Sequence, residues 1–162
     1  MTQPAAIELQ QAIFAILSAD VGVAAALPKV TIANAPTVAL FDLVPQELIK
    51  LFESGQGPTY ATFGQGTEAF EPFDSDDDDA DELVESSHLI AVHVYSQQVG
   101  LLEAKSIIDL IRVAIANGRA GIDLPTNNLK LLDPVSAEYR RLDDGFTSHG
   151  ALVLRAITTP KE

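Results

Sequence analysis

The chain of 162 residues contains no cysteine and no tryptophan. The absence of cysteine excludes disulfides, thiol catalysis and cysteine-based zinc or iron–sulfur sites. No apolar run approaches the roughly 20 residues that a membrane-spanning helix needs. The N-terminus also lacks the basic residues that open a secretory signal. The length and the 47% hydrophobic content therefore predict one domain over residues 1–162 that is made in the cytoplasm and has no membrane partner.

Basic residues are missing from the whole stretch between Lys50 and Lys105. The net charge is −13, and nine of the 23 acidic residues lie in an acidic loop over residues 71–85. Outside this loop 14 acidic residues stand against 10 basic ones, which is an ordinary balance. A surface of this sign repels nucleic acid, so we expect no direct binding of DNA or RNA.

Four carboxylates of the acidic loop match a calcium-binding pattern in part. Asp74, Asp76, Asp78 and Glu85 have the spacing of positions one, three, five and twelve of a calcium loop. Position six is Asp79, where such a loop needs glycine for its sharp turn. Because a run this acidic fits almost any carboxylate spacing, we favour a solvated loop with no metal. An acidic calcium-binding interaction module at those four residues stays as the alternative, and no cofactor is expected.

A strand followed directly by a helix organises the middle of the chain. Residues 87–95 are rich in β-branched and aromatic types and contain no glycine or proline, which predicts a half-buried strand. From Leu101 to the stop signal Asn117-Gly118, apolar residues recur every three or four positions. This spacing predicts a helix whose buried face consists of Ala104, Ile107, Ile108, Ile111, Ala114 and Ile115.

The rest of the chain adds strands and helices to this unit. Residues 143–145, Asp-Asp-Gly, are a hairpin turn signal, and Pro134 in the strand before it predicts a bulge or a sheet edge. The further elements that we predict are helices over 4–17 and 45–53 and strands over 29–33, 58–63, 129–142 and 146–157. This order predicts an α+β fold, in which two main helices pack on one face of an antiparallel or mixed sheet of about four or five strands. A long C-terminal β-hairpin closes the sheet.

No catalytic motif is visible in the sequence. The G-x-S-x-G elbow and the glycine-rich phosphate-binding patterns are missing. His88 and His93 lie five apart on one strand, so they point to opposite faces and cannot share a metal. A small hydrolase that uses His149 with a nearby carboxylate is a third hypothesis, but no nucleophile partner is indicated. We predict that the protein is not an enzyme and has no catalytic residues.

With no catalytic site indicated, we expect the protein to act through surfaces that bind other proteins. A long hairpin beside an acidic loop suits a subunit that assembles with copies of itself. The candidates for this oligomer interface are the residues near the hairpin tip, namely Tyr139, Arg140, Arg141, Phe146 and His149.

Four stretches of the chain resemble a known family in their order and spacing. They are an opening helix at residues 9–17, a Pro-aromatic strand ending in glycine at 58–64, a strand–helix core at 93–115 and a closing hairpin at 144–152. Together they resemble the phage tail completion family, the tail terminator or tail-to-head joining proteins of long-tailed phages and gene transfer agents. The acidic loop and a longer segment over residues 34–57 depart from the family pattern.

The resemblance implies a structural virion protein with no catalytic residues to carry over. It implies a homo-hexameric ring at the head-proximal end of the tail, which terminates tail tube assembly and joins the tail to the head connector. The implied partners are copies of the chain itself, the tail tube protein and the head–tail connector or neck proteins. The implied location is the head–tail junction of the virion, after assembly in the host cytoplasm.

Overall fold

The computed structural model describes residues 4–32, 34–64, 67–70 and 85–162. Asp74, Asp76, Asp78 and Asp79 of the proposed calcium pattern lie outside the described residues, and Glu85 is exposed just before a strand. In chain order the elements are α1 (Ala5–Ala19), α2 (Val21–Ala26), β1 (Lys29–Ile32), β2 (Ala35–Val38), β3 (Leu40–Phe41), α3 (Gln46–Glu53), β4 (Tyr60–Phe63), β5 (Thr67–Phe70), β6 (Ser86–Ser96), α4 (Leu102–Gly118), the 3-10 helix η1 (Arg119–Gly121), β7 (Asn127–Arg141) and β8 (Ser148–Pro160).

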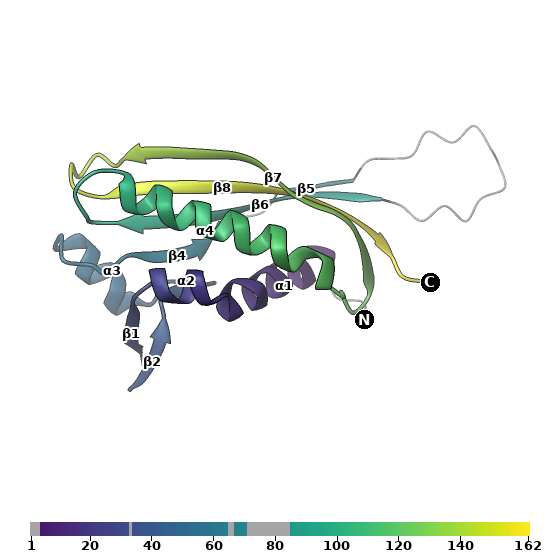
Figure 1. Ribbon diagram of the computed structural model, residues 1–162, viewed down its shortest axis with the longest axis horizontal. Coiled ribbons are helices and arrows are strands. Elements are labelled where there is room, and N and C mark those ends of the chain that lie inside the picture. Colours follow the sequence, from purple (N-terminus) through teal and green to yellow (C-terminus); the bar gives the residue numbers. More distant parts are fainter. Residues whose placement is uncertain (1–3, 33, 65–66, 71–84) are drawn as a thin grey trace.

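Six of the strands form one mixed sheet in the order β3-β4-β6-β8-β7, with β5 paired to β6 beside β4. Only the β3–β4 pair is parallel among these six. Helices α1, α2 and α4 lie on one face of this sheet, and none of the described helices covers the middle of the other face (Figure 1). The α+β prediction is confirmed, including the helices on one face and the long C-terminal hairpin β7–β8.

The core lies between α4 and the centre of the sheet. All six residues of the predicted helix face are buried. Successive strand residues point to opposite faces, so β6 turns Ile90, Val92 and Val94 toward the helix, and β8 adds Leu152 and Leu154. Helix α1 closes the core from the side with its own buried residues, Leu9, Ile13 and Leu17.

The structure contains α2, β2, β3, β5 and η1 in addition to the predicted elements, and one predicted strand lies in a different sheet. The predicted strand over residues 29–33 is present as β1, but it pairs with β2 in a separate two-stranded sheet. Strand β5 was not predicted, because its four residues show no clear alternation.

Pro134 lies inside the single long strand β7, which is the edge of the sheet and has a bulge between Pro134 and Ser136. Both outcomes that the proline predicted, a bulge and an edge, therefore occur together.

A buried carboxylate ties the first helix to the last hairpin. Glu8 is 2% exposed, and its carboxylate accepts hydrogen bonds from the backbone N–H of Thr126 at 3.1 Å, from the Thr126 hydroxyl at 2.5 Å and from the Asn127 amide at 3.0 Å. Burial acts to raise the pKa of Glu8, but the hydrogen bonds from Asn127 and Thr126 outweigh it, and the pKa lies below its ordinary value. The charged form of Glu8 therefore stabilises the folded chain.

We predict that Glu8→Gln destabilises the protein by about 1–3 kcal/mol at neutral pH, because an amide cannot accept all of these bonds. A carboxylate with a lowered folded pKa contributes stability that is complete above the unfolded value of 4.5 and is lost as the pH falls through the folded pKa. Urea unfolding at neutral and acidic pH measures both effects. The difference in the free energy of unfolding between the unmodified chain and Glu8→Gln should become smaller in acid. A difference that stays constant with pH would contradict this role of Glu8.

We also predict that Ile111→Asp destabilises the protein by about 3 kcal/mol or more, because it places an unpaired charge in the core. Ile111 is 0% exposed on α4. Val113 lies on the same helix and is 43% exposed, so Val113→Asp is a matched control with an expected effect within about 0.5 kcal/mol. If chemical unfolding shows that Ile111→Asp and Val113→Asp lose the same free energy of unfolding, α4 does not lie on the sheet as described.

Candidate functional site

Three connections that are far apart in sequence meet at one end of the sheet. The turn between β6 and α4, the turn between β7 and β8, and helix α3 with the loop after it lie together there (Figure 1). We call this surface the hairpin end. It is the end opposite to the one where β6 begins.

A half-buried glutamine joins the segments of the hairpin end. Gln97 accepts a hydrogen bond from the backbone N–H of Gly57 at 2.6 Å. Its side-chain amide donates to the backbone oxygen of Phe52 at 2.8 Å and to the Thr147 hydroxyl at 3.2 Å. One side chain thus fixes α3, the loop that follows it and the start of the last hairpin strand relative to one another.

Glu103 holds the first turn of α4 against two strands. Its carboxylate accepts hydrogen bonds from the Thr59 hydroxyl at 3.0 Å and from the Ser96 hydroxyl. Beside it, the Ser148 hydroxyl donates to the backbone oxygen of Gly100 at 2.7 Å. Gly100 has a φ of 83°, a conformation that glycine adopts without strain. The turn between β6 and α4 is therefore held by β8.

The second turn of the hairpin end is organised by Asp144. Its carboxylate accepts hydrogen bonds from the Thr147 hydroxyl at 2.5 Å and from the backbone N–H groups of Thr147 and Phe146 at 2.8 and 3.0 Å. The bond from the Thr147 hydroxyl is the main reason why the pKa of Asp144 lies below its ordinary value. The Asp-Asp-Gly signal in the sequence thus marks turn chemistry.

This polar scaffold displays apolar side chains. Val99 is 98% exposed, Leu102 76% and Phe146 41%. Phe146 also lines a groove of about 340 Å³, which we call the aromatic groove. Its lining includes Phe52, Tyr60, Tyr95, Leu142 and Phe146 together with the carboxylate-bearing Glu53 and Asp144. Exposed apolar groups on a rigid base are typical of surfaces that contact other proteins.

A row of side chains leads from the aromatic groove across the uncovered face of the sheet. Tyr60, Tyr95, His149 and Arg140 are register partners on β4, β6, β8 and β7. The rings of Tyr60 and Tyr95 stack with centroids 5.1 Å apart, and those of Tyr95 and His149 stack at 4.7 Å. His93 completes the row, because its Nδ1 lies 2.8 Å from Nε2 of His149.

The two paired histidines are held neutral. Burial, and then the electrostatic interactions with His93 and Arg140, lower the pKa of His149 to about 4. Burial and then Arg140 also lower the pKa of His93. One ring can therefore donate N–H to the other at neutral pH. Within the described residues each ring has the other as its hydrogen-bond partner, and no hydroxyl nucleophile is bonded to either ring.

The sequence placed the histidines correctly on their faces but did not predict the pair. His88 points into the core, where its Nε2 lies 2.9 Å from the Thr158 hydroxyl, and His93 lies on the other face as expected. The contact between His93 and His149 depends on the register in which Tyr95 faces His149. No local signal in the sequence indicates this register, because α4 and β7 lie between β6 and β8 in the chain.

The five candidate interface residues are not all in one place. Arg141 and Phe146 lie at the hairpin end, and Arg140 is exposed at the end of the row. His149 is buried beneath its neighbours. Tyr139 faces α4, where the Lys105 ammonium lies 5.5 Å from its ring centroid. The exposed members of the set are the three on the hairpin tip and the adjoining edge.

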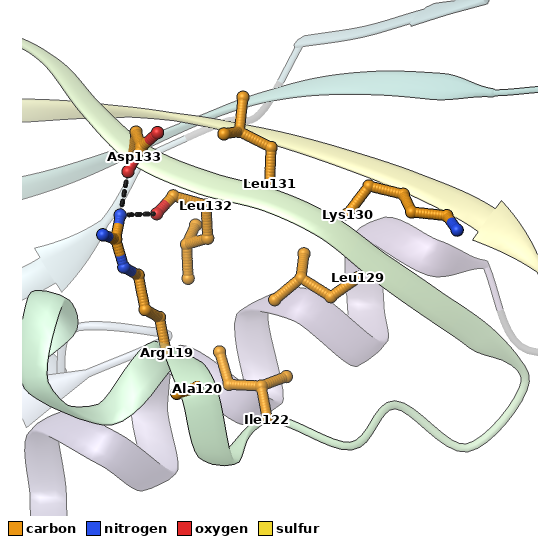
Figure 2. A pocket seen from close by; sticks show the side chains of 8 residues that line it. All are labelled: Arg119, Ala120, Ile122, Leu129, Lys130, Leu131, Leu132 and Asp133. Carbon is orange, nitrogen blue, oxygen red and sulfur yellow. Dashed lines mark hydrogen bonds and ion pairs between the residues drawn. The ribbon is translucent and has the colours of Figure 1, made fainter.

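A second groove, of about 420 Å³, lies between η1 and the first half of β7. Figure 2 shows Arg119 reaching across it, where the guanidinium pairs with the Asp133 carboxylate and donates to the backbone oxygen of Leu132 at 3.2 Å. Apolar side chains such as Ile122 and Leu129 lie below this bridge (Figure 2). Arg119 covers a backbone acceptor of the edge strand, and bulges lie on both sides, so this half of the edge is protected against pairing.

No group of three or more metal-ligating side chains occurs in the part of the chain that the structure describes. Over the same residues, no helix has both the length and the apolar character needed to cross a membrane.

Comparisons with known proteins match most of the chain. A family model described as "Tail completion protein gp17" matches residues 11–159. Among solved structures, a chain of the "Virion of native gene transfer agent (GTA) particle" is similar with a TM-score of 0.69 and 21% sequence identity. The match covers 98% of this chain and 99% of that chain, and at this identity it shows a shared fold. No curated protein matches the chain.

We predict that the histidine pair makes the fold sensitive to mild acid. A histidine with a lowered folded pKa contributes stability that is complete above the unfolded value of 6.5 and is lost as the pH falls toward about 4. Thermal unfolding should therefore show a falling melting temperature between about pH 7 and pH 5. His149→Gln removes the titrating ring and should flatten this slope, and an unchanged slope in the variant would assign the effect to other groups.

Proposed function

The chain belongs to the family of tail completion protein gp17, and from this premise we propose that it forms a ring at the head-proximal end of a phage-type tail. Membership makes it a structural tail protein of a virion. In the proposed ring it ends the polymerisation of the tail tube and joins the tail to the head connector. Its proposed partners are copies of itself, the tail tube protein and the neck proteins. We propose no catalytic role.

The observation that carries this proposal is the hairpin end. Polar side chains fix its three connections, and the exposed groups there include the apolar Val99, Leu102 and Phe146. A monomer gains nothing from holding such groups in water, whereas a subunit that docks end-on to another ring buries them. The location at the head–tail junction is consistent with such a docking surface at one end of the strands.

The sheet also has the edges that a closed ring requires. A ring needs two different surfaces that fit each other on opposite sides of the subunit. Strand β7 is one edge, and β3 with β5 forms the other. The first half of β7 is protected, but residues 136–141 are regular, largely exposed and free of proline. They end in Arg140 and Arg141, whose charge favours contact with an acidic chain such as this one.

We predict that the purified full-length chain forms a discrete oligomer of about six subunits. Light scattering should give about six times the 17.3 kDa of one chain. Arg140→Glu with Arg141→Glu reverses the charge of the β7 edge and should shift this oligomer toward the monomer, while the circular dichroism spectrum stays that of the folded chain. The matched control is Arg112→Glu, because Arg112 is exposed on α4 and pairs with Asp109. If the chain is a monomer in every assembly condition, the ring proposal is wrong.

A further inference from the structure

The segment between the first helices and β4 forms a small unit with an incomplete core. Its buried apolar residues are Ala39, Phe41 and Leu48. The side chains that pack on them are only partly buried, namely Val30, Ile32, Val44, Phe52 and Tyr60. In the same segment Leu43 is 87% exposed. This unit includes the longer segment that departs from the family pattern. Its strand β3 joins the edge of the main sheet, whereas β1 and β2 do not.

The most exposed part of this unit is the hairpin β1–β2, which we call the arm. Its strands pair with each other over four residues and do not join the main sheet. Figure 1 shows the arm projecting away from the six-stranded sheet. Asn34 forms its turn with a φ of 64°, a conformation that asparagine tolerates. Two-stranded hairpins are marginally stable in water on their own, so an arm of this kind gains from a partner.

The arm differs in charge from the rest of the chain. Residues 21–41 contain no acidic residue, and Lys29 is their one charged residue, in a protein with a net charge of −13. Ala35, Pro36 and Thr37 are exposed near the turn. Such a neutral tip can enter an apolar site without leaving a charge unpaired there.

The aromatic groove has the chemistry to receive this tip. The Phe52 and Tyr60 rings meet edge to face with centroids 4.8 Å apart, and the Tyr60 and Tyr95 rings stack. Proline docks well on surfaces lined by aromatic rings. The carboxylates of Glu53 and Asp144 also line the groove, and they disfavour the acidic segments that make up much of the remaining exposed chain.

We propose that the arm of one copy is received by the aromatic groove of a second copy, with Pro36 against the aromatic rings. This inference rests on the proposed function, in which copies assemble into a ring. The arm and the groove are different surfaces of one subunit, so the contact is head-to-tail, as ring closure requires. In this contact the partly buried side chains of the small unit are covered by a second copy of the chain. The segment over residues 34–57 then lies between neighbouring subunits.

The absence of cysteine makes a clean test possible. Ala35→Cys is placed on the arm, Glu53→Cys on the groove and Asp109→Cys on the exposed side of α4 as a control. Oxidation of a mixture of the Ala35→Cys and Glu53→Cys chains should give a disulfide-linked dimer, and a chain with both changes should give a ladder of linked subunits. The mixture of Ala35→Cys with Asp109→Cys should give neither.

A second variant tests whether the contact contributes to assembly. Pro36→Asp adds a charge to the arm and should raise the concentration for half-assembly at least about tenfold, which is about 1.4 kcal/mol. Ala25→Asp adds the same charge on the exposed side of α2 and should leave the concentration for half-assembly unchanged. If the oligomer forms but neither the cross-link nor the Pro36→Asp effect is seen, the arm contact is wrong and the ring stands. If the unmodified chain is monomeric throughout, both proposals fail.

Discussion

The packing of α4 on the sheet decides where every other surface of this protein lies. Its apolar stripe must be buried, and the alternating residues of β6 and β8 that face it complete the core. The same alternation sends the intervening residues, among them His93 and Tyr95, to the other face. None of the described helices covers the middle of that face (Figure 1), and His93 and Tyr95 are half-buried there. The row from Tyr60 to Arg140 is thus a consequence of how the core forms.

Periodic patterns made the central part of the fold predictable. The six apolar residues of α4, the strand before it and the turn at residues 143–145 each carry a local signal that survives in the structure. Pro134 indicated an edge or a bulge for a backbone reason, since proline has no N–H to donate to a ladder. These features depend on near neighbours in the chain, which is why residue spacing alone was sufficient to predict them.

Features that depend on distant partners could not be predicted in this way. The arm has the composition of an ordinary strand, and nothing in its residues indicates that it leaves the main sheet. Gln97 is one polar residue in a turn, yet it joins segments 40 and 50 residues away. Glu8 has an unremarkable place in a helix pattern, and its partners are more than 100 residues distant. The aromatic groove combines four such segments, so its existence follows from the fold as a whole.

The bond from Glu8 to the start of β7 also fixes where the two ends of the chain lie. Lys161 donates its backbone N–H to the oxygen of Thr126, next to the Glu8 contact. The start of α1 and the end of β8 accordingly lie near the same end of the sheet, away from the β7–β8 turn (Figure 1). In the proposed ring, a fluorescent or electron-dense label fused to either terminus would therefore lie on one rim and leave the opposite rim unobstructed. Microscopy of labelled particles could then read the direction in which the subunits point along the tail.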